Sequence, residues 1–384
     1  MKNRTGIFVF IHCVAVMLVA ASPQIASAQK TKPPILPPPI TYQIAFMDSA
    51  TRLWSLNELG VAVGSIATAT ENRAIVRNAD GVVTDLTTAV QARDPNCPWS
   101  LLDYAFEINE SGQIAGRGWR IEDGVPQARL FRYSAIDGTL EAVRIFDPSS
   151  TLFVKGMNDS GDVLLHAAVD GQDTLPSQPG QGDSVWVFSG LPGLGFGTHL
   201  LDKAVPASIN NFGAIAGAID TGTRSLAFRL TPGQTGLDYF GTINGSSSSR
   251  YQVSDGLAIS DLGTLAGWAC AGKTKTRDNT SQRAVRLRAD GTWEDLQGST
   301  VNSWARSINY FGDTVGFGAA TGTGFIHYAG KMYSLRDLLV NAPTNLTNVY
   351  PRRITDGGQI CGEVLLVKAD GTTFESAVIL TPVH

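Results

Sequence analysis

The chain has few of the residues that most often carry catalysis or bind metals. Its 384 residues include five histidines and four cysteines. Four recurrent patterns are missing: the Gly-x-Ser-x-Gly elbow, the His-Glu-x-x-His zinc pair, paired cysteine ligands and a phosphate-binding glycine loop. The histidines beyond residue 28 are scattered and share no partner pattern; they are His166, His199, His327 and His384. The sequence therefore predicts no metal site and no cofactor and assigns no catalytic residue, with His166 alone considered as a base at a loop rim.

Long apolar runs are missing after the N-terminus. One run, Gly6 to Ala21, follows Lys2 and Arg4 and precedes the small residues Ala26-Ser27-Ala28. This order is typical of a signal peptide, and the run is shorter than the roughly 18 to 20 residues of a membrane span. We therefore expect cleavage after Ala28 and a secreted or periplasmic mature protein without a membrane span. Residues 29–39, QKTKPPILPPP, predict an extended proline-rich linker.

Positive charge is not in excess. The chain has 30 Lys and Arg against 34 Asp and Glu, a net charge of -4, and removal of Lys2 and Arg4 with the signal peptide makes it -6. An acidic balance disfavours nucleic acid as a partner. We expect a monomer whose partner is an extracellular glycan or protein.

Cysteines are too few for a disulfide framework. The mature chain has Cys97, Cys270 and Cys361, an odd number in a compartment that favours disulfides. Cys361 occupies a position where sister repeats have small apolar residues, so we expect it to be buried and free. A Cys97–Cys270 bridge stays an open alternative.

Glycine and asparagine mark an internal repeat with a period near 50 residues. Its core is an aliphatic residue, usually Asn, two variable residues, Gly, three mostly apolar residues and usually another Gly. The seven copies begin at Leu56-Asn57, Ile108-Asn109, Met157-Asn158, Ile209-Asn210, Ile259-Ser260, Ile308-Asn309 and Ile354-Thr355. Their first glycines are Gly60, Gly112, Gly161, Gly213, Gly263, Gly312 and Gly358. The repeat fills the mature chain.

Each copy predicts two hairpins. In the first, Asn caps a tight turn through its side chain, and Gly accepts the positive φ of that turn. A second hairpin follows at Asp-Gly pairs such as Asp80-Gly81, Asp137-Gly138 and Asp290-Gly291. Each period thus holds four short strands and no convincing helix.

Seven units of four antiparallel strands predict an all-β protein, a seven-bladed β-propeller over residues 40–384. The last copy supplies a returning strand and Ser376 to Leu380, then ends at His384 without a fourth strand. Residues 40–46 alternate between apolar and polar side chains, as a half-buried strand does. We expect this N-terminal strand to complete the last blade and close the ring.

The motifs resemble the HAF repeat family of extracellular bacterial proteins, named for a His-Ala-Phe triplet after the Asn-x-x-Gly core. Leu226-Ala227-Phe228 is the nearest triplet, and Asp261-Leu262-Gly263-Thr264-Leu265-Ala266-Gly267 looks like another family phrase. The resemblance covers nearly all of the mature chain. It implies a propeller-like fold and an extracellular location but no mechanism. The family's His is missing here, so no role for it is carried over.

The blade pattern also indicates a working face. Both tight turns lie on one face, and connections of variable length lie on the other, where functional loops tend to occur. These loops are Thr87 to Trp99, His166 to Asp183, Gly245 to Ser254, and Ala269 to Ser281 with Lys273, Lys275 and Arg277. Four tryptophans in or near this face are candidate binding residues, with packing between blades as the alternative role; they are Trp99, Trp119, Trp268 and Trp304.

Two functions follow from the sequence. The first is a non-catalytic binding module that recognises a glycan, an extracellular polymer or a protein through the variable face. The second is a propeller hydrolase or lyase, in which acids and His166 meet at the mouth of a central channel. The sequence favours the first without deciding whether the protein is an enzyme, and a purely structural role is a third hypothesis.

Overall fold

The computed structural model describes residues 40–383 except 49, 145–150, 169–181, 190–196, 223–224, 244–253, 271–281, 298–301 and 319–322. The expected signal peptide (1–28) and linker (29–39) lie outside the described residues, as do most of the loops expected over 166–183, 245–254 and 269–281. The chain divides into two units, Met1–Ile35 and Leu36–His384, and all described elements belong to the second. No helix of the described residues is long and apolar enough to cross a membrane.

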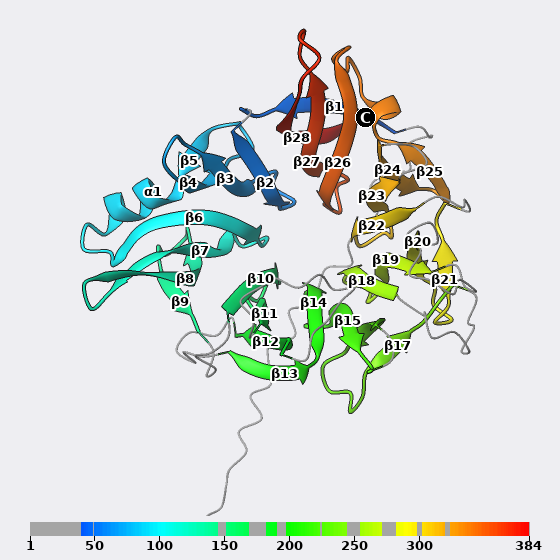
Figure 1. Cartoon of the computed structure of the whole chain (residues 1–384), viewed down its shortest axis with the longest axis horizontal. Helices are drawn as coiled ribbons and strands as arrows, with labels where there is room; N and C mark the ends of the chain where they lie inside the picture. Colours follow the sequence, from blue (N-terminus) through cyan, green and yellow to red (C-terminus); the bar gives the residue numbers. More distant parts are fainter. Residues whose placement is uncertain are drawn as a thin grey trace, which may run out of the picture. The chain divides into compact units, whose positions relative to one another are not determined.

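The described strands form seven four-stranded antiparallel sheets around a common centre (Figure 1), which confirms the expected propeller. In blades 1 to 6 the chain runs from the innermost strand outward. Blade 1 contains β2 (Thr51–Leu56), β3 (Ala62–Ala67), β4 (Asn72–Arg77) and β5 (Val83–Asp85). Blade 2 contains β6 (Trp99–Ile108), β7 (Gln113–Glu122), β8 (Val125–Ser134) and β9 (Leu140–Val143). Blade 3 contains β10 (Thr151–Met157), β11 (Val163–Ala168), β12 (Ser184–Phe188) and β13 (Thr198–Asp202).

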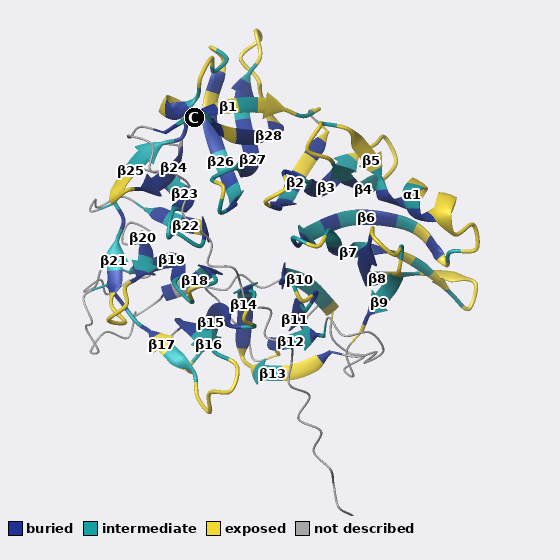
Figure 2. Cartoon of the chain, turned by 180° about the vertical axis from the view of Figure 1, so that it is seen from behind, coloured by how far each residue is buried: buried dark blue, intermediate teal, exposed yellow. Residues whose placement is uncertain are grey.

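The next three blades repeat this order. Blade 4 contains β14 (Ala204–Ile209), β15 (Ile215–Asp220), β16 (Ser225–Leu230) and β17 (Asp238–Phe240). Blade 5 contains β18 (Ser254–Ile259), β19 (Leu265–Cys270), β20 (Gln282–Leu287) and β21 (Trp293–Asp295). Blade 6 contains β22 (Ser303–Ile308), β23 (Thr314–Gly318), β24 (Thr323–Tyr328) and β25 (Lys331–Ser334), and the 3-10 helix η2 (Arg336–Leu338) follows it. The core lies between neighbouring blades, where buried side chains follow the strands (Figure 2).

Blade 7 joins the two ends of the described chain, as expected. It contains β26 (Leu346–Ile354), β27 (Ile360–Val367), β28 (Thr373–Val383) and, as its outermost strand, β1 (Thr41–Phe46). β1 pairs antiparallel with β28, and Tyr42 of β1 is fully buried. We call the junction of blades 7 and 1 the seam. Its core includes Leu53 and Leu56 of blade 1 and Cys361 and Ile379 of blade 7.

The Asn-x-x-Gly motif forms the predicted turn in every blade. The N–H of each first glycine donates to the carbonyl at the Asn position at 2.8–3.1 Å, and these glycines have φ between 72° and 85°. The side-chain oxygen at the Asn position accepts the N–H of the residue four places on. Ser260 and Thr355 do this with their hydroxyls in blades 5 and 7. A local hydrogen bond thus fixes the turn whichever of the three residues is present.

The residues after the Asn position link each turn to the next blade. We call them the turn ring; they are Glu58, Glu110, Asp159, Asn211, Asp261, Tyr310 and Asp356. At six junctions of the described chain, the backbone N–H of one member donates to the side chain of the next. At the seam, Glu58 accepts from Asp356 and also from Gly357, at 2.9 Å. The ring is therefore closed on the turn face as well as by β1.

One expected loop is a helix. The sequence predicted no helix and placed a loop over Thr87 to Trp99, but α1 (Leu86–Arg93) covers most of this range. Asp85 caps the helix by accepting the N–H of Thr88, and Leu86, Thr87 and Val90 are buried. The prediction was wrong because one capping carboxylate and a few contacts with blade 2 stabilise a short helix that has little amphipathic pattern of its own.

Deletion of residues 40–47 should lower the melting temperature sharply or make the protein insoluble. It removes the outermost strand of blade 7 and the buried Tyr42, and a buried aromatic side chain alone contributes about 3–5 kcal/mol. Cys361 gives a second measurement, because burial raises the pKa of its thiol to about 12 and keeps it unreactive. We expect this thiol to react with a maleimide only in the deletion variant. A variant lacking residues 29–36 is the control, and an unchanged melt after loss of 40–47 would contradict the closure.

Replacement of Glu110 by Gln should stabilise the protein at pH 8 but not at pH 5. Burial, with the nearby carboxylates of Glu58 and Asp159, raises the pKa of Glu110 from about 4.5 to about 7. The folded state therefore binds this proton more tightly than the unfolded state, and stability falls as the pH rises from about 4.5 to 7. Gln carries no charge at either pH, so its urea midpoint should exceed the wild-type midpoint only at the higher pH. An equal difference between the two urea midpoints at pH 5 and at pH 8 would contradict a raised pKa of Glu110.

Candidate functional site

Every innermost strand has a β-bulge at the same position. The pairing between the first and second strand of each blade skips one residue, two places before the motif's aliphatic residue. We call the skipped residues the bulge ring; they are Trp54, Phe106, Lys155, Ala207, Leu257, Arg306 and Arg352. Bulges change the direction of side chains and often lie next to functional sites. Here they occur on the seven strands that surround the centre (Figure 1).

The second glycine of the repeat accompanies the bulge in six blades, whereas blade 3 has Leu165 at this position and is bulged as well. A Cβ atom at Gly64 would lie 1.8 Å from the carbonyl oxygen of Arg52, and one at Gly316 would lie 2.0 Å from that of Trp304. Only glycine allows the bulged strand to approach this closely. In the six blades that have it, the second glycine is a sequence signal for the close approach of the bulged strand.

The bulge ring is chemically asymmetric. On blades 7, 1 and 2 its side chains pack in series: the guanidinium of Arg352 lies 4.3 Å above the Trp54 ring, and Trp54 meets Phe106 edge-on at 6.0 Å. Arg306 occupies the same position on blade 6 and is exposed. We call these four residues, on consecutive blades, the aromatic–arginine arc. Outside the arc, blade 3 carries Lys155, and blades 4 and 5 carry the uncharged Ala207 and Leu257.

Ion pairs hold most charged side chains near the arc. Arg352 donates to both oxygens of Glu363 at 3.0 Å. Arg353 of blade 7 donates to the carboxylate of Glu107 of blade 2 at 2.6 Å. Ser55 of blade 1, which lies between them, donates to the same carboxylate at 3.0 Å. Burial raises the pKa of Glu107, although Arg353 and Ser55 oppose that shift. These pairs tie together the blades on both sides of the seam.

A second aromatic group lies on the same side of the ring. Trp304, two residues before Arg306 on β22, stacks on Phe317 at 6.2 Å, and Phe317 stacks on Tyr350 of blade 7 at 5.4 Å. Trp304 is half-buried and donates through Nε1 to Gln282 at 3.0 Å. Trp99 also lies on an innermost strand, β6, but seven residues before Phe106, so Trp304 is the sequence-selected tryptophan nearest in sequence to a member of the arc.

The other three tryptophans lie elsewhere. Trp99 is buried and packs edge-on against Phe131 at 5.9 Å, and Trp268 is 4% exposed. Trp99 belongs to a core cluster with Val63 and Ala74 of blade 1, so it packs between blades, the alternative role considered for it. Trp119 is 38% exposed on β7 of blade 2. The structure does not bring the four together, because they belong to blades 2, 5 and 6.

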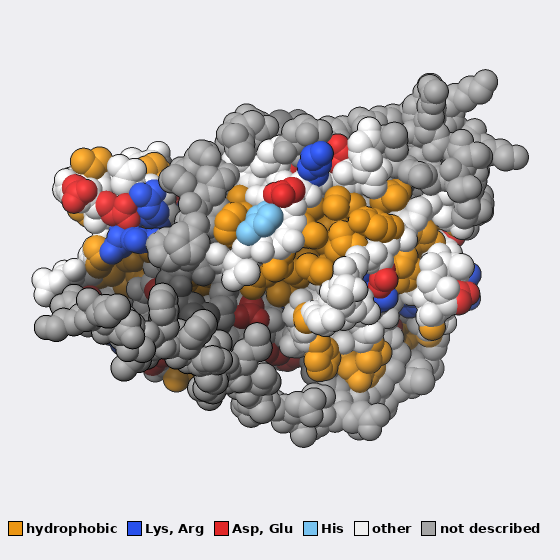
Figure 3. Space-filling model, turned by 90° about the horizontal axis from the view of Figure 1, so that it is seen from below, with side chains coloured by type: hydrophobic (Ala, Val, Ile, Leu, Met, Phe, Trp, Pro, Cys, Tyr) orange, Lys and Arg blue, Asp and Glu red, His pale blue; other side chains and the backbone are white. Residues whose placement is uncertain are grey.

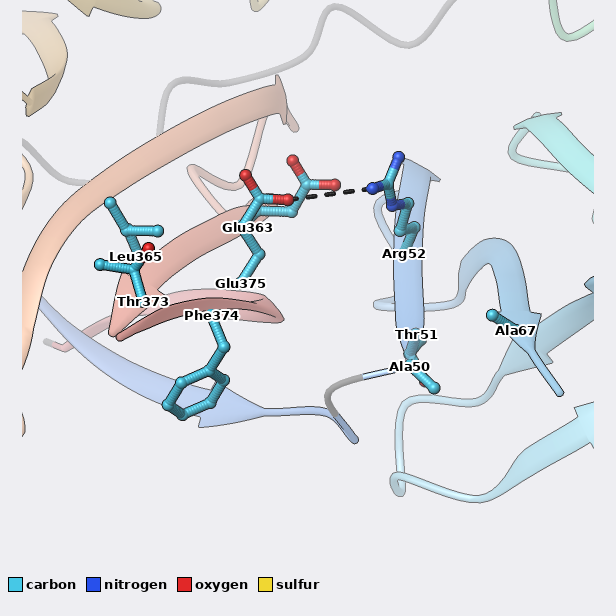
Figure 4. Close-up of a pocket in the computed structure, with 9 residues that line it drawn as sticks. All are labelled: Ala50, Thr51, Arg52, Ala67, Glu363, Leu365, Thr373, Phe374 and Glu375. Atoms are coloured by element: carbon cyan, nitrogen blue, oxygen red, sulfur yellow. Dashed lines mark ion pairs between the residues drawn. The ribbon is translucent and has the colours of Figure 1, made fainter. Parts of the chain in front are cut away.

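A cleft of about 580 Å³ opens at the seam (Figure 4). Its lining is Ala50, Thr51, Arg52, Ala67, Glu363, Leu365, Thr373, Phe374 and Glu375. The carboxylates of Glu363 and Glu375 point from blade 7 towards Arg52 of blade 1, which lies 3.9 Å from Glu375. Glu363 also binds Arg352, so the cleft adjoins the aromatic–arginine arc. The sequence did not predict this cleft, since its two walls come from opposite ends of the propeller chain.

His166 is not at an open rim. Its side chain is fully buried, contacts Asp183 at 2.9 Å and stacks on Phe153 at 5.8 Å. Cys361 is buried, as predicted, and Cys97 and Cys270 are not joined by a disulfide. Within the described ranges, no three His, Cys, Asp or Glu side chains lie together in a way that could hold a metal ion.

The outer surface of blades 3 and 4 is apolar. Figure 3, seen from the side of β13 and β17, shows hydrophobic side chains gathered beside a histidine and an acidic side chain. Leu200, Leu201 and Leu237 are among the half-buried side chains that pack on the core there. His199 contacts Asp202 at 2.9 Å and meets Trp186 edge-on. This surface lies on outer strands and contributes nothing to the arc.

Comparison with known proteins supports the fold alone. No family model and no curated protein sequence matches the chain. The β-propeller domain of the Trilobed protease from Pyrococcus furiosus is similar in structure, with a TM-score of 0.51 and 8% identity over 87% of this chain and 97% of that one. The Pyrococcus horikoshii acylaminoacyl peptidase gives a TM-score of 0.49 and 10% identity over 85% of this chain and 53% of that one. An oligogalacturonate lyase from Vibrio parahaemolyticus gives 0.49 and 9%, over 90% and 92%.

Proposed function

We propose that the protein is an exported, non-catalytic binding propeller of the HAF repeat type, which recognises a glycan at the centre of its ring. The observation that carries the proposal is the aromatic–arginine arc with Trp304 beside it. Aromatic faces pack against the apolar faces of sugar rings, and arginines donate hydrogen bonds to sugar oxygens. Bulges on a rigid set of strands supply the fixed positions that such recognition needs. The expected signal peptide, residues 1–28, would place the protein where extracellular glycans occur.

The second hypothesis, a hydrolase or lyase, needs carboxylates that are available to exchange protons. The carboxylates of Glu107, Glu363 and Glu375 each face a guanidinium, those of Arg353, Arg352 and Arg52. A carboxylate held in this way must leave its arginine before it can contact a substrate as a general acid or base. His166, the candidate base, is buried against Asp183 and Phe153. We therefore propose binding rather than catalysis.

Replacement of Trp304 by Ala should weaken glycan binding by about tenfold or more, because an aromatic anchor of a binding site contributes about 2 kcal/mol. Trp119→Ala is the matched control: its side chain is also accessible, but it lies on blade 2, away from the arc. The measurement is a glycan-array and cell-envelope pulldown screen followed by titration with the strongest ligand, with melting temperatures recorded for all variants. Trp304→Phe should retain most of the affinity.

Two outcomes would overturn this proposal. One is the absence of any glycan ligand for the wild-type protein in either screen. The other is a loss of binding in Trp119→Ala with unchanged binding in Trp304→Ala, which would move recognition from the centre to the β7–β8 hairpin.

A further inference from the structure

Arg306 differs from the other arginines of the innermost strands. Arg352 pairs with Glu363, Arg353 with Glu107, and Arg52 with Glu375. Arg306 has no ion-pair partner within the part of the chain that the structure describes, and its side chain is exposed. Exposure on an innermost strand leaves its guanidinium available to a ligand at the centre.

The neighbourhood of Arg306 is also unfavourable for a second positive charge. Removal of water by the surrounding protein, together with the positive charge of Arg352 at the equivalent position on the adjacent blade, lowers the pKa of Arg306, although part of its side chain is open to solvent. Glu363 opposes this effect but is already held by two hydrogen bonds from Arg352. An anion beside Arg306 would relieve the repulsion and stabilise both guanidinium groups.

The arc has further donors without acceptors. Nε1 of Trp54 and Nε of Arg352 are buried and have no hydrogen-bond partner among the described residues. Buried N–H groups in folded proteins are nearly always paired, so two such groups in one stack favour a ligand or water rich in acceptor oxygens. Both belong to the stack in which Arg352 covers the Trp54 ring.

The positive charge is local. The whole chain has a net charge of -4, so its surface as a whole does not attract polyanions. A guanidinium presents a planar fork of donors that matches a carboxylate. Arg306 lies on the same strand as Trp304, two residues further on. We propose that the bulge ring binds an acidic saccharide, a uronate unit whose carboxylate pairs with Arg306 while its sugar ring packs on the aromatic side chains. This inference rests on the proposed function and specifies its ligand.

The test compares uronate oligosaccharides with their carboxyl-reduced, neutral counterparts, prepared from alginate, polygalacturonate and hyaluronan. Calorimetric titration of the wild-type protein should show at least about tenfold tighter binding of one uronate over its neutral counterpart, as expected for a charge-assisted pair. Arg306→Gln should abolish this preference without changing affinity for the neutral sugar, and Arg306→Lys should keep part of it. Arg288→Gln removes the same charge from an exposed turn outside the bulge ring and should behave as wild type.

The outcomes separate the two proposals. Equal binding of uronate and neutral sugar by the wild type, or a preference that survives in Arg306→Gln, overturns the uronate inference and leaves glycan recognition standing. An equal loss in Arg288→Gln and Arg306→Gln, or equally tight binding of dextran sulfate, also overturns it, since either result indicates nonspecific attraction. Failure of the wild type to bind any saccharide overturns both.

Discussion

The polar residue that ends each innermost strand is the constraint on which the rest of the propeller depends. In five blades it is a buried asparagine, whose oxygen closes its own turn. At four junctions its amide also donates to the turn carbonyl of the next blade, at 2.9–3.2 Å. A buried amide that loses such partners destabilises a protein by about 1–3 kcal/mol. The spacing of neighbouring innermost strands is therefore fixed at their ends.

This constraint also determines where the candidate site lies. Because each turn is held against the next, the bulges two residues before the aliphatic position occur in the same place on every innermost strand. The aromatic–arginine arc crosses the seam, with Arg352 from blade 7 lying over Trp54 from blade 1. The site therefore requires a closed ring. Pairing of β1 with β28 and the hydrogen bonds to Glu58 therefore hold the two blades that carry Arg352 and Trp54 together.

Much of the fold could be predicted because its signals are local and repeated. Asn and Gly at fixed spacing specify the turns, and the N-terminal alternation around Tyr42 specifies the closing strand. The helix after Asp85 was missed because its stability comes from contacts with another blade. The burial of Trp99 and Trp268 was not predicted either, because hydrophobicity alone does not distinguish a packed tryptophan from an exposed one.

The candidate site was harder to predict for a different reason. Members of the bulge ring share a position but no chemistry, from Ala207 to Arg352, so the repeat itself gives no hint of them. Two features of the sequence are related to the site. One is the second glycine, which lets the bulged strand approach closely in the blades that have it, and the other is the acidic or amide side chain that recurs after the Asn position and accepts a hydrogen bond from the neighbouring turn. The proposed recognition depends on what differs among the blades, and the fold depends on what they share.

The most direct test of this account is a crystal structure of the protein with a bound uronate oligosaccharide. The account predicts a sugar ring packed against the aromatic side chains at the centre, with its carboxylate within hydrogen-bond distance of Arg306. A saccharide bound instead on the turn face, or on the apolar outer surface of blades 3 and 4, would contradict it.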